Sequence, residues 1–307
     1  MNTTLRQLKI FEAVARQLSF TKAAQELHLT QPAVSMQVSQ LEESAGLPLF
    51  EKVGKHIKLT EAGTEMFYYS QNIQQQLREL SDVMESLKGG HRGHLRISAA
   101  TTANSFATQL ISSFTHRYPE ATFALDVTNR QTLLVQLEKN EADLVIMGQP
   151  PEDPDLQPTA FMENPLVIIA APNHPLARAN RLIGLHELEQ ETFVVREKQS
   201  GTRIAMERFF NERHIEIRAG MEMTSNSTIK HSVAAGLGLG LVSYHTLELE
   251  LETGRLVILK VEDFPIHRHW HVVFNRRFRL PPIAREFLDF LHGQEAEPLL
   301  RFRFPDQ

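Results

Sequence analysis

The chain has 307 residues, of which 42% are hydrophobic and 22% are charged, with 37 Asp and Glu against 32 Lys and Arg. This length indicates about two domains, and the ordinary composition excludes disordered and fibrous proteins. Cysteine is absent, which excludes a disulfide framework, thiolate metal sites and cysteine nucleophiles.

The charge is unevenly distributed along the chain. Residues 1–60 carry seven Lys and Arg against five Asp and Glu, whereas residues 93–307 carry 22 against 27. Any contact with nucleic acid is therefore expected in the N-terminal part, and it depends on where the cations lie. Because the first 20 residues have no continuous apolar core and no apolar run approaches about 20 residues, we expect no signal peptide, no membrane span and a cytoplasmic location.

Residues 5–45 contain three short helical patterns. The first covers residues 5–18, and the second covers residues 20–27 after the capping residue Ser19. The third starts after Thr30, its expected N-cap, and one of its faces is apolar. Its other face carries side chains that can donate and accept at base edges: Gln31, Ser35, Gln37, Ser39 and Gln40, with Met36 among them. Residues 20–39 therefore predict a helix–turn–helix whose second helix reads the major groove.

Residues 50–59 predict a small β-hairpin with a turn at Gly54. Three lysines decorate it: Lys52, Lys55 and Lys58. We interpret it as a wing whose lysines meet DNA phosphates and position the module without reading sequence. The alternative is a small helical bundle with a solvated basic hairpin, and the helical patterns alone leave that alternative open.

Residues 19–63 resemble the DNA-binding domain of LysR-type transcriptional regulators nearly residue for residue. The resemblance rests on TQPAVS at the start of the third helix, on the run LEE…G.PLFE and on LT..G at the start of the next helix. It implies double-stranded operator DNA as a partner and base contacts from Gln31, Pro32 and Ser35. Many members carry Arg where this chain has Met36, so the charged contact at that position is absent. The expected DNA-binding residues are Gln31, Pro32, Ser35, Met36, Gln37, Lys52 and Lys55.

Residues 62–87 predict one long helix, because glycine stands only near its start and proline is absent. Apolar residues step by 4, 3, 4 and 3 positions, as in a coiled-coil seam: Ile73, Leu77, Leu80, Met84 and Leu87, with Met66 and Tyr69 upstream. A core helix of the next domain would also fit this pattern. The glycines at 89–90 favour instead a dimerisation helix at residues 61–90, separate from a winged helix–turn–helix at residues 1–60. Two copies would bring two recognition helices to the half-sites of a partly palindromic operator.

From residue 94 onward, strand and helix patterns alternate. Strands are predicted at 95–100, 122–127, 142–147, 166–171, 193–195, 221–224 and 239–243, and helices at 105–118, 132–139, 203–213 and 228–235. The series predicts two α/β lobes with parallel-rich sheets. Lobe I is expected at residues 91–164 and 266–296, and lobe II at residues 165–265. Ligands of such lobes bind at the carboxyl ends of strands, usually in the cleft between the lobes.

Three loops have the composition of an anion site at a helix N-terminus: residues 101–102, residues 200–203, and residues 225–227 with Lys230 one turn on. Each loop alone is more often an ordinary helix cap, but three in one two-lobed domain favour an anion cradle. The predicted effector-binding residues are Ser98, Thr101, Thr102, Ser200, Gly201, Thr202, Arg203, Asn226 and Lys230.

The C-terminal region is similar to the effector domain of LysR-type regulators, which is like a type 2 periplasmic binding protein. The phrases DLVIMGQPP, PLVIIAAPNHPLA, TFVVREKQSGTRIAMERFF and MEMTSNSTIKHSVAAGLGLGLVS look like the branch that regulates RuBisCO and carbon-fixation operons, the CbbR-type regulators. The resemblance implies an α/β effector domain behind an all-α winged helix–turn–helix. It also implies phosphorylated effectors such as ribulose bisphosphate and phosphoenolpyruvate, or NADPH. RNA polymerase is the implied partner of a homodimer or homotetramer, in which the effector would change the angle between the lobes.

Other chemistry receives little support from the sequence. His267, His269 and His271 alternate along one strand face, which rarely closes on one metal ion, and the GLGLG run at 236–240 is no dinucleotide fingerprint. We interpret these glycines as allowing close packing where a helix turns into a strand. We expect no catalytic residues, metal or cofactor. A regulator of another pathway, a solute-binding protein and a sugar-phosphate enzyme are the alternatives, and the sequence leaves open whether the protein activates or represses.

Overall fold

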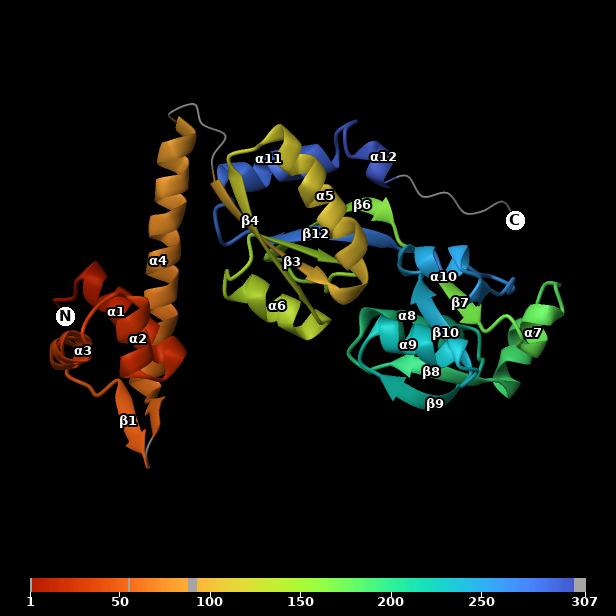
Figure 1. Cartoon of the computed structure of the whole chain (residues 1–307), viewed down its shortest axis with the longest axis horizontal. Coiled ribbons are helices and arrows are strands. Elements are labelled where there is room, and N and C mark those ends of the chain that lie inside the picture. Colours follow the sequence, from red (N-terminus) through yellow and green to blue (C-terminus); the bar gives the residue numbers. More distant parts are fainter. Residues whose placement is uncertain (1, 55, 88–92, 301–307) are drawn as a thin grey trace. The chain divides into compact units, whose positions relative to one another are not determined.

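The computed structural model describes residues 2–54, 56–87 and 93–300. The chain forms two compact units, Met1–Met84 and Glu85–Gln307 (Figure 1). Among the described residues, no helix has the length and apolar character needed to cross a membrane. Lys55 and residues 88–90, which carry part of the predicted wing and linker, lie outside the described residues.

The first unit begins with three helices, α1 (Leu5–Gln17), α2 (Phe20–Glu26) and α3 (Gln31–Ala45). Both predicted caps are confirmed, because Ser19 Oγ accepts from the N–H of Lys22 at 3.3 Å and Thr30 Oγ1 accepts from the N–H of Ala33 at 3.4 Å. These bonds satisfy backbone donors that a helix start leaves free. The predicted start of α3, directly after Thr30, is therefore confirmed.

A two-stranded wing follows, made of β1 (Phe50–Val53) and β2 (His56–Leu59), which pair antiparallel. Glu42 Oε1 accepts from the N–H groups of Leu49 and Phe50 at 2.8 and 3.2 Å, so the end of α3 holds the start of the wing. A Cβ on Gly63 would lie 2.0 Å from the carbonyl oxygen of Leu49, so only glycine permits this close approach.

The long helix α4 (Glu61–Leu87) packs its first half against the winged domain. Met66, Phe67 and Ile73 lie against a buried cluster formed by Leu8, Phe11, Ala15, Leu41 and Leu49. Farther along, Leu77, Leu80 and Met84 are 40%, 52% and 50% exposed. The sequence analysis predicts the winged domain and this helix as separate segments. In the structure, α4 as far as Met84 belongs to the same compact unit as the winged domain.

The second unit contains two five-stranded sheets, which we call lobe I and lobe II. The lobe I sheet has the order β4-β3-β5-β12-β6 and the lobe II sheet the order β11-β7-β10-β8-β9. The lobe I strands are β3 (Gly93–Ala100), β4 (Ala121–Thr128), β5 (Leu144–Met147), β6 (Leu156–Glu163) and β12 (His269–Asn275). The lobe II strands are β7 (Leu166–Ala170), β8 (Thr192–Arg196), β9 (Arg218–Met223), β10 (Leu239–Ser243) and β11 (Val257–Ile258).

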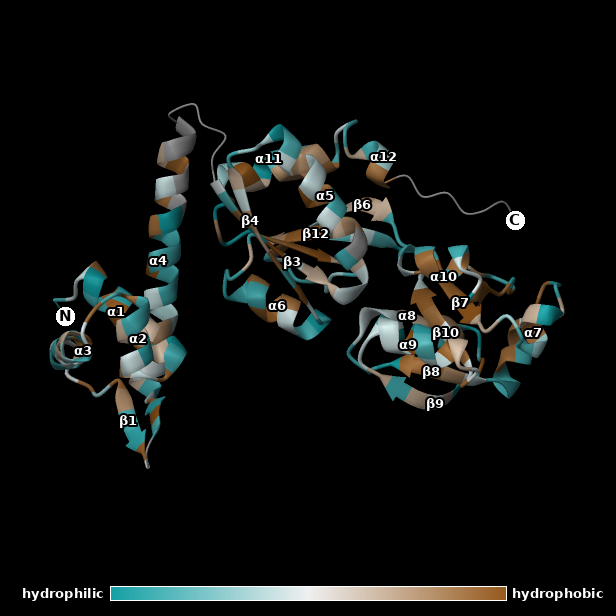
Figure 2. Ribbon diagram, in the orientation of Figure 1, coloured by the Kyte–Doolittle hydropathy of each residue, from teal (hydrophilic) through white to brown (hydrophobic). Residues whose placement is uncertain are grey.

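Helices cover both sheets, and the central strands form the apolar layer that Figure 2 shows in brown. Lobe I has α5 (Asn104–Arg117), α6 (Arg130–Glu138), α11 (Pro282–Leu291) and α12 (Glu297–Leu300), with a short 3-10 helix at Thr101–Ala103. Lobe II has α7 (Pro175–Arg178), α8 (Gly201–Glu212), α9 (Asn226–Ala234) and α10 (Glu248–Glu252), with 3-10 helices at Leu185–Gln190 and Tyr244–Thr246.

The prediction of parallel-rich sheets is wrong, because each sheet is mixed. In lobe I, β3 pairs parallel with β4 and β5, while β12 pairs antiparallel with β5 and β6. In lobe II, β10 pairs parallel with β8, and β8 pairs parallel with β9, whereas β7 pairs antiparallel with β10 and β11. The strands that flank the two crossings between the lobes, β6, β7 and β12, all take part in antiparallel pairs. Strand β6 is absent from the predicted strands because Pro158 weakens its pattern, and proline is tolerated at this edge of the sheet.

The interpretation of the GLGLG run is confirmed by the packing between α9 and β10. A Cβ on Gly238, whose φ is +141°, would lie 2.3 Å from the carbonyl oxygen of Thr192. A Cβ on Gly240 would lie within 3.0 Å of Val233 and Ile229 on α9. Side chains at these two positions would therefore push the helix or the neighbouring strand away.

Replacing Asp143 with alanine is expected to destabilise the second unit by about 3 kcal/mol. Asp143 is buried, its Oδ1 lies 2.5 Å from Arg96 Nη2, and its Oδ2 accepts from the Arg96 backbone N–H at 2.8 Å. Alanine leaves the Arg96 cation and a strand N–H without their acceptor. Urea denaturation measures the change, and adding Arg96→Met should recover part of the loss. A change below about 0.5 kcal/mol would show that the pair contributes little.

Candidate functional site

The recognition helix α3 presents its predicted residues at the surface. Gln31, Pro32 and Met36 are exposed, and Ser35 and Gln37 are half-buried. Gln37 Nε2 donates to Gln40 Oε1 at 3.2 Å, so these two amides form a connected polar row. The structure thus brings the five predicted residues of α3 to one accessible end of the helix.

Small residues hold this helix against the rest of the helix–turn–helix. Val34 and Val38 of α3 are buried in a cluster that also contains Ala23 and Ala24 of α2, which are 0% and 3% exposed. Alanine side chains allow α2 and α3 to approach closely, so the buried face of α3 leaves its polar face outward.

On the wing, Lys52 is exposed, whereas Lys58 Nζ lies 2.8 Å from Glu51 Oε1. Within the described residues Lys52 has no ion pair. Lys52 is therefore the described wing residue best suited to a phosphate, and Lys55 falls outside the described residues.

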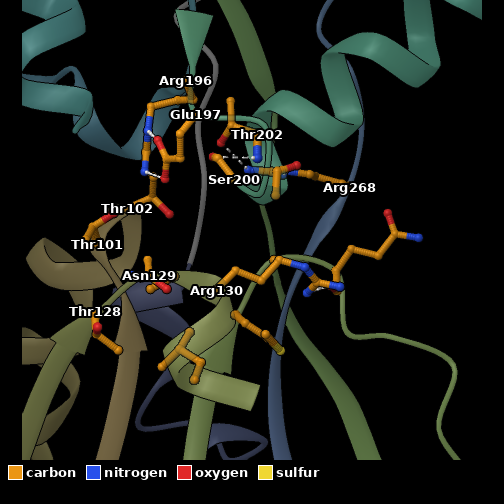
Figure 3. Close-up of a pocket in the computed structure, with 16 residues that line it drawn as sticks. Thr101, Thr102, Thr128, Asn129, Arg130, Arg196, Glu197, Ser200, Thr202 and Arg268 are labelled. Carbon is orange, nitrogen blue, oxygen red and sulfur yellow. Dashed lines mark hydrogen bonds and ion pairs between the residues drawn. The ribbon is translucent and has the colours of Figure 1, made fainter. Parts of the chain in front are cut away.

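A pocket lies between lobe I and lobe II of the second unit. Figure 3 shows lobe II residues on one side of it and the loops of lobe I on the other. Its polar lining residues are Thr101, Thr102, Thr128, Asn129, Arg130, Gln149, Arg196, Glu197, Ser200, Thr202 and Arg268. Three arginines therefore face one carboxylate, so the pocket has a net positive charge.

Arg268 stands on the segment that enters β12 from lobe II. Its Nη1 donates to the carbonyl oxygen of Gly201 at 3.2 Å, and its Nη2 donates to Thr202 Oγ1 at 3.4 Å. Burial lowers the pKa of the Arg268 guanidinium to about 9, which still leaves the group charged at neutral pH. No carboxylate of the described chain lies within ion-pair distance of it. A desolvated cation with neutral partners is suited to binding an anion.

Arg196 and Arg130 add two further guanidinium groups. Arg196 Nε and Nη2 each lie 2.8 Å from a carboxylate oxygen of Glu197, and Nη1 donates to Asn226 Oδ1 at 2.8 Å. Arg130 Nη1 donates to the carbonyl oxygen of Gln149 at 2.8 Å, and burial lowers the pKa of Arg130. Arg196 is the last residue of β8, and Arg130 is the first residue of α6, two positions after the end of β4.

Helix starts supply further donors to the pocket. Ser200 caps α8 by accepting from the N–H of Thr202 at 3.3 Å, and Asn129 caps α6 by accepting from the N–H of Thr132 at 3.0 Å. Since the partial positive charge of a helix lies at its N-terminus, both helices favour an anion at this position.

Five of the nine predicted effector residues line the pocket: Thr101, Thr102, Ser200, Gly201 and Thr202. The other four do not line it. Ser98 lies earlier on β3 and is buried in the sheet. Arg203 turns to Glu207, whose Oε1 lies 2.5 Å from Arg203 Nε.

Asn226 and Lys230 also lie behind the pocket lining. Asn226 is buried, and its Oδ1 accepts from the pocket residue Arg196. Lys230 Nζ donates to the carbonyl oxygen of Thr246 at 2.6 Å. It also lies 2.8 Å from Glu250 Oε1, so this carboxylate of α10 neutralises the lysine. Their placement next to a helix start suggested a ligand role. In the structure Arg196 bonds Asn226 Oδ1 and Glu250 pairs with Lys230, while the buried Nδ2 of Asn226 has no hydrogen-bond partner among the described residues.

The three pocket arginines were missed by the sequence reasoning. Arg196 and Arg130 stand at or just after the carboxyl ends of predicted strands, and that position could have marked them. Arg268 stands between His267 and His269, and no local signal separates it from a solvated residue. Its role depends on the chain crossing back from lobe II, which a single-sequence pattern does not reveal.

The histidine row has a packing role at one member. His271 Nδ1 lies 2.5 Å from the carbonyl oxygen of Gly148, a pocket-lining residue. In the described part of the chain no group of three or more His, Asp or Glu side chains is arranged to hold a metal ion.

Comparison with known proteins identifies the family to which this chain belongs. Residues 5–64 match the family of bacterial regulatory helix-turn-helix proteins of the lysR type, and residues 88–296 match the LysR substrate binding domain. The chain belongs to the LysR family. It is a DNA-binding transcriptional regulator with a winged helix–turn–helix and a two-lobed effector domain, which confirms the predicted fold class and family.

Relatives of this LysR-family regulator include transcriptional regulators of the RuBisCO operon. A RuBisCO operon transcriptional regulator from Allochromatium vinosum is 55% identical over 296 residues, covering 96% of this chain and 98% of the relative. The transcriptional regulator CbbR of Rhodospirillum rubrum is 45% identical over 287 residues, covering 94% and 95%. The solved CcmR regulatory domain of Synechocystis, in complex with 2-PG, is 39% identical with a TM-score of 0.61, covering 64% of this chain and 95% of that one.

Proposed function

We propose that this regulator controls RuBisCO and other carbon-fixation genes in response to a phosphorylated metabolite that binds between the two lobes. The 55% identity to a RuBisCO operon regulator over nearly the whole chain supports the target. The observation that carries the ligand class is the pocket itself, where Arg130, Arg196 and Arg268 face a single carboxylate, Glu197. The CcmR domain that is similar to lobes I and II is described in complex with 2-PG.

The charge and the donors of the lining favour a small phosphorylated acid or sugar. A phosphate ester carries close to two negative charges at neutral pH and offers three acceptor oxygens. The lining supplies guanidinium donors, the hydroxyls of Thr101 and Thr202, and two helix starts. The ligand is bound as a signal and is released unchanged.

Calorimetric titration of the full chain tests the ligand class. The probes are 2-phosphoglycolate, ribulose bisphosphate and phosphoenolpyruvate, with inorganic phosphate and benzoate as controls. Saturable binding of at least one phosphorylated probe, tighter than that of inorganic phosphate, is expected. If a folded sample bound none of the three phosphorylated probes, the phosphorylated-effector assignment would be wrong.

We further propose that the working form is a homodimer or a homotetramer that binds operator DNA in the bacterial cytoplasm and contacts RNA polymerase. The exposed apolar side chains of Leu77, Leu80 and Met84 on α4 support self-association. Their spacing is that of a coiled-coil seam, and packing a second helix against these side chains would remove their apolar surface from water. Two recognition helices would then read two half-sites.

Two substitutions separate base reading from phosphate contact. Gln31→Ala is expected to lower operator affinity about 10-fold to 100-fold and to relax specificity at the bases it contacts. Lys52→Ala is expected to weaken specific and non-specific DNA about equally and to reduce the salt slope by about one. Fluorescence anisotropy over a series of salt concentrations measures both. A Gln31→Ala protein with unchanged operator affinity would remove this residue from the recognition surface.

A further inference from the structure

Two chain segments connect lobe I with lobe II, and they run antiparallel to each other. The N–H of Asn164 donates to the carbonyl oxygen of Arg268 at 2.7 Å, and Leu166 and Ile266 exchange two backbone hydrogen bonds at 3.0 Å. Asn164 lies at this crossing and is 0% exposed. A buried polar side chain at such a position has to find hydrogen-bond partners inside the protein.

The side chain of Asn164 joins the pocket cation to lobe II. With its amide oxygen turned to the guanidinium, Asn164 accepts from Arg268 Nε and Nη2, both at 3.2 Å. Its Nδ2 then donates to Ser243 Oγ at 2.8 Å, and Ser243, the last residue of β10, is also 0% exposed. This orientation satisfies both ends of the amide, whereas the opposite one would set its NH₂ group against the guanidinium donors.

Every contact of the Arg268 guanidinium described above is to a neutral oxygen. These oxygens belong to Asn164, to the backbone of Gly201 and to the hydroxyl of Thr202. Neutral acceptors fix the direction of a guanidinium and leave its charge uncancelled. An aspartate in the place of Asn164 would accept the same bonds and would neutralise the cation. The amide is therefore the side chain that both orients Arg268 and keeps the pocket positive.

We propose that Asn164 is a positioning residue for effector binding, which aims Arg268 into the pocket through a neutral acceptor and is itself held by Ser243 of lobe II. The proposal rests on the proposed function in that the pocket ligand is an anion. It adds that the affinity for this anion depends on a side chain that does not line the pocket.

The binding test uses Asn164→Asp in the full chain, with 2-phosphoglycolate as the probe. Because the carboxylate keeps the acceptor geometry and cancels the charge, the Kd is expected to rise about 30-fold or more while the Tm stays within about 2 °C of wild type. Ser243→Ala keeps the charge and is expected to raise the Kd less than about 5-fold. An Asn164→Asp protein with a wild-type Kd would overturn the proposal, since a purely structural role does not predict a charge-specific loss.

A second test needs no ligand and separates this proposal from the proposed function. Asn164→Asp is combined with Arg268→Met, and the Tm of all four proteins is measured. Without the guanidinium the new carboxylate is buried and unpaired, so Asn164→Asp is expected to lower the Tm by at least about 5 °C more in the Arg268→Met background than in the wild-type background. Equal effects in both backgrounds would overturn the proposal. Failure of the wild-type chain to bind the phosphorylated probes would overturn the effector assignment alone.

Discussion

Replacing Arg268 with methionine is expected to weaken binding of 2-phosphoglycolate by at least about 100-fold. A charged hydrogen-bond partner removed from a desolvated site typically costs about 2–5 kcal/mol of binding free energy, because the ligand anion is then left without its counter-charge. Methionine has a similar length and no charge, so packing near Asn164 and Gly148 changes little. Calorimetry on the full chain measures the Kd.

Lysine at the same position separates charge from geometry. Arg268→Lys keeps one positive charge, but an ammonium group cannot reach Asn164, Gly201 and Thr202 with a planar fork. We therefore expect an affinity between those of the wild type and of Arg268→Met.

The matched control for Arg268→Met is Arg203→Met. Arg203 stands one residue after the pocket residue Thr202, but its Nε lies 2.5 Å from Glu207 and it does not line the pocket. The control variant should bind the ligand within about threefold of wild type. Equal losses in both variants would indicate that ligand binding responds to net charge and that Arg268 has no special place.

The N-terminal domain was well predicted because its signals are local. Ser19 and Thr30 cap helices within three residues, and the apolar stripe of α3 is visible at spacings of four and three. The wing likewise depends on a glycine turn between two short runs. Such features depend on neighbours in sequence, so the pattern contains most of the information that the fold uses.

The pocket was only half predicted because its chemistry is non-local. Thr101 and Ser200 carry a local signal, since they stand at helix starts after strands. Arg268 gains its role from Asn164, which is 104 positions away, and from the start of α8. The mixed direction of the sheets has the same origin, because it depends on where the chain crosses between lobes.

Four of the predicted effector residues do not line the pocket. Arg203 and Lys230 were assigned to the anion site because cations stood near helix starts, yet Glu207 and Glu250 neutralise them. The i,i+4 spacing of Arg203 and Glu207 could have indicated in the sequence that this cation has a carboxylate partner on its own helix.

Replacing Leu80 with glutamate is expected to lower operator affinity by about 100-fold or more while leaving both units folded. Leu80 is 52% exposed on α4 and stands in the middle of the predicted seam. A charge at this position therefore disfavours the packing of a second helix and leaves the core of the monomer unchanged. Once the two recognition helices are uncoupled, each binds a half-site alone and loses an avidity of about 10²–10⁴. Analytical ultracentrifugation and operator binding are measured on the same samples.

The control for Leu80→Glu is the same change at Leu182, which is 64% exposed in lobe II and outside the seam. Leu182→Glu should sediment and bind the operator like wild type. If Leu80→Glu sedimented like wild type at micromolar concentration, the exposed stripe of α4 would not be the dimer seam. If it became monomeric and still bound the full operator with wild-type affinity, recognition would not depend on two coupled helices, and the half-site geometry proposed above would be wrong.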